Sequence, residues 1–190
     1  MSSQNLTHKE VAIAATKFIK NFFGCDLAAW EFSGGYQDEQ CDGYCLNRRG
    51  SHVIEAKVSR ADFLADRKKP HRADPANSVG QYKFYAVPET PGIIKEGEIP
   101  QNWGLIYVDA KKRCSLFWNM PPKVRQERQQ KLQECIRWGW QSRSYLKRRY
   151  YCDWFYEDHP KFKTDPRKEY LFLYYLARRY KSGKFSNNIL

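Results

Sequence analysis

The feature that most constrains this chain is an apolar strand that ends in charged residues. Residues 52–58 read HVIEAKV, and in an extended strand Glu55 and Lys57 point to one face while their neighbours point to the other. A buried strand gains no packing energy from a carboxylate and an ammonium group at its end. The pair therefore indicates a chemical role, although a Glu-x-Lys ladder on a surface hairpin is a common alternative.

A second carboxylate is expected beside this pair. A hairpin is expected over residues 41–58, and if its turn centres on residues 49–50, Asp42 lies opposite Lys57 and diagonally from Glu55. Diagonal neighbours on paired strands lie about 7–8 Å apart at the backbone, so both carboxylates can reach one ion.

These groups are the donors that a hard divalent cation requires. Mg²⁺ binds oxygen ligands, usually one or two carboxylates with water and substrate phosphate. We expect Asp42, Glu55 and the backbone carbonyl of Ala56 to hold Mg²⁺ or Mn²⁺. The ion would polarise a phosphate and lower the pKa of an attacking water. Lys57 would stabilise the developing charge or orient that water.

The same residues resemble a known signature. Asp42 followed by Glu55-Ala56-Lys57 is similar to the motif of the PD-(D/E)XK nuclease superfamily, and the run 55–68 (EAKVSRADFLADRK) resembles its MmcB-like DNA-repair branch. Segments 82–88 (YKFYAVP) and 99–110 agree with that branch, so the similarity spans about residues 7–113.

The resemblance implies a fold and an activity. The fold would be α/β and restriction-endonuclease-like, with a mixed central sheet flanked by helices. The activity would be Mg²⁺- or Mn²⁺-dependent hydrolysis of DNA phosphodiester bonds, in DNA repair or in phage or defence DNA processing. The chain departs from the family where Cys41 replaces the motif's proline, in the long insertion 70–79, and in everything after Asn119.

Two further residues are candidates for the catalytic set. Thr7 and Glu10 form a Thr-x-x-Glu capping box for a helix extending to about Asn21. Glu10 can also approach the metal, as a first-helix carboxylate does in some members of the superfamily. Gln81, in a strand expected over 79–87, can orient water or phosphate.

Basic residues supply the candidate substrate contacts. Ser59 and Asp62 form a second capping box, which begins a helix through about Lys68 whose N-terminus can face phosphate. A solvated helix end explains the basic residues after it equally well. The candidate contacts are Arg60, Arg67, Lys68, Lys69, Arg72, Lys83, Lys147, Arg148 and Arg149.

Charge divides the chain in two. The 190 residues have a formal net charge of +12 and a pI of about 9.4, and residues 121–190 contain 17 Lys or Arg against 7 Asp or Glu. We therefore expect a nuclease-like core over 1–120 and a basic helical extension over 121–190, with DNA, or RNA, as the partner. Aromatic residues at 143–156 can stack on bases, but helical spacing favours a core role.

The remaining features exclude other classes of protein. The first residues lack the pattern of a signal peptide, and no apolar run reaches the length of a membrane span, so we expect a cytoplasmic protein with reduced cysteines. A zinc site from Cys41, Cys45 and His52 lacks a fourth ligand. The main alternative to a nuclease is a non-catalytic nucleic-acid-binding or inhibitor protein on the same fold. Nothing in the sequence sets an oligomeric state.

Overall fold

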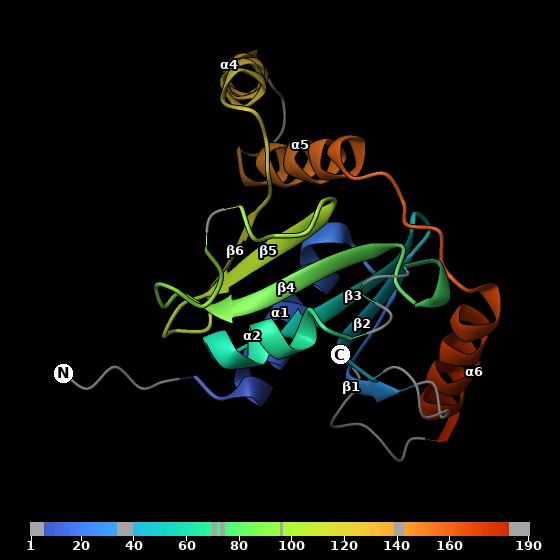
Figure 1. Ribbon diagram of the computed structural model, residues 1–190. Coiled ribbons are helices and arrows are strands. Elements are labelled where there is room, and N and C mark those ends of the chain that lie inside the picture. Colours follow the sequence, from blue (N-terminus) through green and yellow to red (C-terminus); the bar gives the residue numbers. More distant parts are fainter. Residues whose placement is uncertain are drawn as a thin grey trace. The chain divides into compact units, whose positions relative to one another are not determined.

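A six-stranded mixed sheet forms the centre of the larger of two compact units (Figure 1). The computed structural model describes residues 6–33, 40–69, 72, 75–95, 97–138 and 143–182. The strands lie in sequence order: β1 (Leu27–Ser33), β2 (Gln40–Asn47), β3 (Gly50–Ala56), β4 (Tyr82–Pro88), β5 (Trp103–Val108) and β6 (Cys114–Phe117). β3, β4 and β5 are parallel to one another, and the other neighbours are antiparallel. The expected α/β class with a mixed sheet is confirmed.

Helix α1 (His8–Phe23) covers one face of this sheet. Thr7 caps it with Glu10 in the expected capping box. At its other end the Phe23 ring lies 5.2 Å from the His52 ring and 5.8 Å from the Phe84 ring. α1 approaches β2 closely because position 43 is glycine, where a Cβ would lie 2.2 Å from the Thr16 hydroxyl oxygen.

Two helices cover the opposite face. Phe63 of α2 (Arg60–Asp66) packs against Tyr85 of β4, with ring centroids 5.2 Å apart. Phe172 and Leu176 of α6 (Pro166–Ser182) join Val53 of β3 in a second apolar cluster. The alternating side chains of β3 therefore face α1 on one side and α2 with α6 on the other.

The β2–β3 hairpin differs from the expected register. Asn47 pairs with Gly50, so the turn consists of residues 48 and 49, and Gly43 pairs with Ile54. Continuing this register places Asp42 opposite Glu55, whereas Lys57 was expected there. The physical reason is local: the Asn47 side-chain oxygen accepts the backbone N–H of Arg49 at 2.8 Å, which begins the turn one residue earlier.

Helices α4 (Pro122–Trp138) and α5 (Arg143–Asp158) form a second compact unit, residues 118–160. Trp154 and Phe155 are buried in it, so the aromatic residues of this segment serve as core, as helical spacing favoured. Trp118 donates its indole N–H to Asp158 at 2.8 Å, and Arg128 ion-pairs with the same carboxylate at 2.6 Å.

The division of the chain differs from the expected one. The described residues from 161 to 182 belong to the first unit with those from 6 to 117, so the basic region is not a single extension. Glu169 of α6 explains this, since its carboxylate accepts Tyr44 Oη at 2.9 Å, Ser51 Oγ at 2.8 Å and the Gly80 N–H at 2.8 Å. These three bonds attach α6 to the sheet.

Other element boundaries shift by a few residues. The helix expected to reach Lys68 ends at Asp66, and the strand expected from residue 79 begins at Tyr82, after the 3₁₀ turn η1 (Pro75–Asn77). Residues 70, 71, 73 and 74 of the insertion lie outside the described residues. None of the described helices combines the length and apolarity that a membrane span requires.

Candidate active site

Three groups from distant parts of the chain meet at the carboxyl end of β3. Nε2 of His8, at the start of α1, lies 3.3 Å from Asp42 Oδ2 and 3.1 Å from the Ala56 carbonyl oxygen. The Ala56 N–H donates to the same Asp42 oxygen at 2.8 Å, which fixes the carboxylate over the strand end. The hydrogen bond to Asp42 raises the pKa of His8 above its usual value.

Glu55 and Lys57 lie beside this point in a buried ion network. Lys57 Nζ is 3.3 Å from Glu55 Oε2 and 3.3 Å from Asp66 Oδ1. Arg72 lies 3.0 Å from Glu55 Oε1 through Nη2 and 2.8 Å from Asp66 Oδ2 through Nε. The side chains of all four residues are at most 6% exposed, so these charges neutralise one another away from bulk water.

Asp66 is the acceptor that the network shares. Besides Lys57 and Arg72 it accepts the Tyr85 hydroxyl at 2.8 Å and ion-pairs with Lys69 at 2.9 Å. It reaches this position because the capping interaction at Ser59 begins α2 directly after β3, and Asp66 lies on the last turn. Tyr85 presents its hydroxyl there because residues 55 and 85 are paired on adjacent parallel strands.

Burial and pairing act in opposite directions on the two carboxylates. Burial raises the pKa of Glu55, and the nearby Arg72 and Lys57 oppose that rise only in part. Asp66 is also desolvated, but its hydrogen bonds with Arg72 hold its pKa well below the usual range. The pKa of Lys57 is raised: desolvation lowers it, and Glu55 and Asp66 more than offset that effect. Lys57 is therefore a cation at neutral pH and not a general base.

The donor set suits a divalent cation only if one side chain changes partner. Asp42 and the Ala56 carbonyl already converge, and Glu55 Oε1 is buried without a well-formed hydrogen bond. Glu55 faces Arg72 and Lys57, however, and within the described part of the chain no three His, Cys, Asp or Glu side chains are grouped to hold a metal. Turning Glu55 towards Asp42 would complete three oxygen ligands, and His8 adds a nitrogen suited to transition metals.

Two residues expected in the catalytic set lie elsewhere. Glu10 caps α1 and ion-pairs with Lys112 at 3.0 Å. Its hydrogen bond with the Thr7 backbone, together with the Lys112 contact, lowers its pKa to about 2. Gln81 precedes β4 at the other end of the sheet, where its side chain contacts the position of Gly50. Because β3 and β4 are parallel, the start of β4 lies beside the start of β3, far from Glu55. These positions do not bring Glu10 or Gln81 to the place where a metal was expected.

Several expected substrate contacts are occupied or buried. Arg60 ion-pairs with Glu98, and Arg72 belongs to the buried network. Lys83 is 1% exposed and donates to Ser78, because its position in β4 points into the core. These three residues were expected to contact substrate, and the structure gives them internal roles. The expected contacts that are exposed after α2 are Arg67, Lys68 and Lys69, and Lys69 is ion-paired with Asp66.

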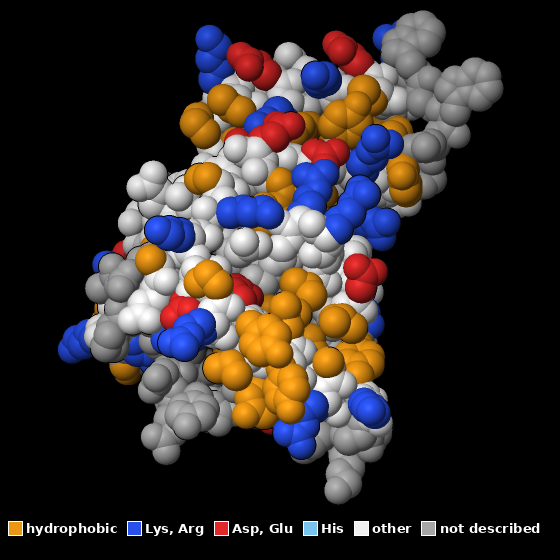
Figure 2. All heavy atoms as spheres, turned by 90° about the vertical axis from the view of Figure 1, so that its right-hand side faces the viewer, with side chains coloured by type: hydrophobic (Ala, Val, Ile, Leu, Met, Phe, Trp, Pro, Cys, Tyr) orange, Lys and Arg blue, Asp and Glu red, His pale blue; other side chains and the backbone are white. Residues whose placement is uncertain are grey.

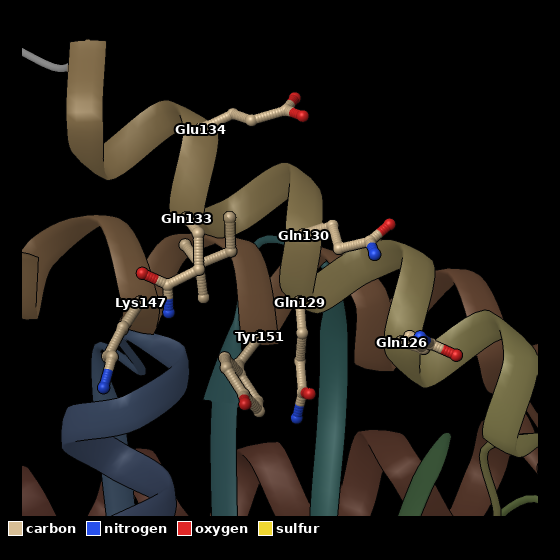
Figure 3. A pocket seen from close by; sticks show the side chains of 8 residues that line it. Gln126, Gln129, Gln130, Gln133, Glu134, Lys147 and Tyr151 are labelled. Atoms are coloured by element: carbon tan, nitrogen blue, oxygen red, sulfur yellow. The ribbon is translucent and has the colours of Figure 1, made fainter.

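The other expected contacts belong to the second unit. Lys147, Arg148 and Arg149 are exposed on α5. Lys147 lines a groove of about 820 Å³ between α4 and α5, with a glutamine-rich wall from α4. In Figure 3, Gln129 points from α4 towards Tyr151 of α5, while Glu134 points away.

The residues that sequence reasoning missed are His8, Asp66 and Tyr85. His8 follows the cap residue of α1, and only the packing of that helix brings its ring to Asp42. Asp66 lies four residues after Asp62 on α2, a spacing that indicates a shared helix side but no partner. Tyr85 was placed correctly in a strand, but its partner depends on the parallel pairing of β3 with β4.

The fold and site define an α/β protein with a charged cluster at the carboxyl end of a central parallel strand. A solved structure of a protein of unknown function from Silicibacter pomeroyi is similar, with a TM-score of 0.53 and 18% identity. The similarity covers 95% of this chain and 94% of that one, and at this identity it shows the fold alone. No protein-family model and no curated protein matches the chain.

Proposed function

We propose that this protein is a metal-dependent nuclease with a restriction-endonuclease-like fold that hydrolyses DNA phosphodiester bonds. The observation that carries the proposal is the convergence of Asp42 and the Ala56 carbonyl, marked by their contacts of 3.3 and 3.1 Å to the same His8 nitrogen. Glu55 and Lys57 adjoin this point on the same strand end. RNA is the alternative substrate for the same chemistry.

The proposal assigns each residue a role. Asp42, Glu55 and the Ala56 carbonyl would hold Mg²⁺ or Mn²⁺, which supplies Lewis-acid polarisation and a more acidic water. Lys57, kept protonated by Glu55 and Asp66, would stabilise the charge that develops on phosphate. Asp66 and Arg72 would position Lys57 and Glu55 and would not touch substrate.

The charge of the cluster explains why the ion is needed. The cluster consists of three carboxylates and three cationic side chains, so their charges cancel. Without an added cation it has little attraction for a phosphate. A divalent ion would add two positive charges, which suits a phosphodiester. The balanced groups are Asp42, Glu55 and Asp66 against Lys57, Lys69 and Arg72.

The test compares Asp42→Asn with Asp62→Asn. The first removes a proposed ligand charge but keeps the shape and an oxygen that can accept the Ala56 N–H, so the fold should survive. The second removes a charge from the same neighbourhood at a residue outside the cluster. Labelled single-stranded, duplex and branched DNA, and single-stranded RNA, are incubated with Mg²⁺ or Mn²⁺, with EDTA as a further control.

Metal-dependent cutting by the parent and by Asp62→Asn, but not by Asp42→Asn, would support the proposal. Cutting that survives Asp42→Asn would contradict the assigned site. The substrate that is cut fastest identifies the substrate class.

A second candidate is a non-catalytic nucleic-acid-binding or inhibitor protein. The observation that favours it is that Glu55 faces Arg72 and Lys57, not Asp42. A protein that binds without cutting any of these substrates, and whose binding is unchanged by Glu55→Gln, would support this candidate.

A further inference from the structure

Helix α6 has two apolar faces, and the sheet covers only one of them. Phe172 and Leu176 are buried against the sheet, while Tyr170 is 66% exposed and Tyr174 is 45% exposed on the outer side. Leu173 is 37% exposed on the same outer side. A surface helix needs one apolar stripe for folding, so the outer face requires another explanation. Figure 2, viewed from the α6 side, shows hydrophobic side chains gathered in a patch with Lys and Arg at its edges.

The exposed rings form a row along the helix. Tyr170 and Tyr174 are one turn apart, with ring centroids 6.5 Å apart and planes inclined by only 22°. One turn further, the Arg178 guanidinium lies 5.7 Å from the centre of the Tyr174 ring. We name Tyr170, Tyr174 and Arg178 the stacking row. Two nearly parallel rings and a guanidinium group therefore follow one another along an exposed helix face. Planar groups arranged in this way can stack on planar bases.

The charge around α6 indicates what kind of partner its outer face would bind. Residues 161–190 contain eight Lys or Arg and two Asp or Glu. Both acids are engaged elsewhere, since Asp165 caps α6 and Glu169 binds the sheet. A second copy of the chain would present the same positive charge and be repelled, whereas a polyanion would be attracted.

A single strand fits the row better than a duplex. The bases of a duplex are stacked on one another and cannot reach exposed rings, but those of a single strand can. From Tyr170 to Lys181 the helix rises about 16 Å. That length accommodates a few nucleotides, with Arg178 and Lys181 available for phosphate.

We propose that the outer face of α6 binds single-stranded nucleic acid, with bases stacked on Tyr170 and Tyr174 and phosphates contacted by Arg178 and Lys181. α6 begins at the hairpin end of the sheet, where Glu169 contacts Ser51, and runs away from the hairpin (Figure 1). Its use in directing substrate to the Asp42 site rests on the proposed nuclease function, but the binding itself does not.

The experiment measures binding without cleavage. The full chain carrying Asp42→Asn is titrated into a labelled 20-nucleotide oligothymidine in EDTA, and fluorescence anisotropy is recorded at several salt concentrations. A duplex of the same length is measured in parallel. Tyr174→Ala should weaken single-strand binding by about 5- to 150-fold, while Tyr174→Phe should retain it because the ring is what stacks. Arg178→Gln should reduce the salt dependence by about 0.7 in the log–log slope.

Tyr180→Ala is the matched control. Tyr180 lies on the same helix and is 43% exposed, but it is six residues from Tyr174 and therefore off the row. Unchanged affinity in Tyr174→Ala, or an equal loss in Tyr180→Ala, would overturn the proposal. A parent dimer that Tyr174→Ala converts to a monomer, with DNA binding unaffected, would also overturn it. If the parent cuts no substrate but the row binds as expected, only the nuclease proposal fails.

Discussion

Asp66→Asn tests the buried ion network, and its effect can be worked from the contacts. The asparagine keeps the shape of the side chain but removes the charge that pairs with Arg72, Lys57 and Lys69. Lys69 is 45% exposed and can turn to solvent, so losing its ion pair with Asp66 should cost at most about 1 kcal/mol of unfolding free energy. Arg72 is only 6% exposed and cannot turn to solvent. It would keep only Glu55 as a charged partner.

Breaking a buried pair by removing one partner costs about 3–5 kcal/mol. For a chain of 190 residues, each kcal/mol lowers Tm by about 2–4 °C, so Asp66→Asn should lower Tm by about 6–20 °C. Thermal and urea unfolding followed by circular dichroism measures the change. Asp62→Asn, in the first turn of the same helix and only partly buried, should cost less than about 1 kcal/mol.

The effect of Asp66→Asn should also depend on pH. The pKa of the Asp66 carboxyl is lower in the folded protein than in the unfolded chain, where it is about 3.9. The ionised carboxylate therefore stabilises the folded protein fully above this unfolded pKa, and the stabilisation is lost as the pH falls below it. The stability difference between parent and variant should therefore be constant from pH 7 to about pH 5 and shrink below that. Equal stability of Asp66→Asn and Asp62→Asn at pH 7 would refute the view that the network holds Arg72.

Three further substitutions test close packing, helix attachment and backbone conformation in the first unit. Gly43→Ala places a Cβ 2.2 Å from the Thr16 hydroxyl oxygen and should lower the unfolding free energy in urea by about 1–3 kcal/mol. Adding Thr16→Ala should recover part of that loss. Purely additive effects of the two substitutions would contradict the steric reason. Glu169→Gln weakens three hydrogen bonds between α6 and the sheet and should cost about 1.5–3 kcal/mol, with faster amide exchange in α6; unchanged exchange would show that apolar contacts alone hold the helix. Gly24→Ala puts a Cβ at φ 63° after α1 and should cost about 1–2 kcal/mol of unfolding free energy, and no loss of stability would mean that the backbone there relaxes.

Local patterns were predicted well because their causes are local. The capping box of Thr7 and Glu10 and the cap at Ser59 depend on residues within one turn of the helix end, and both caps are present. The alternation along β3 predicted that Glu55 and Lys57 share a face, since side-chain direction in a strand follows from the backbone alone.

Register was predicted less well because it depends on the turn. A shift of the turn by one residue, fixed by the Asn47 side chain, moved the partner of Asp42 from Lys57 to Glu55. Periodicity cannot detect this shift, because a change of two in the pairing keeps every side chain on its face.

The sequence by itself determined the α/β class, the helix caps and the shared face of Glu55 and Lys57, because each depends on short local patterns of residues. Only the tertiary structure decided that His8 meets Asp42, that Asp66 and Arg72 enclose Lys57, and that α6 joins the first unit. Those contacts join residues that are distant in sequence. They follow from which faces of helices and strands are buried against each other, and burial is a property of the assembled fold.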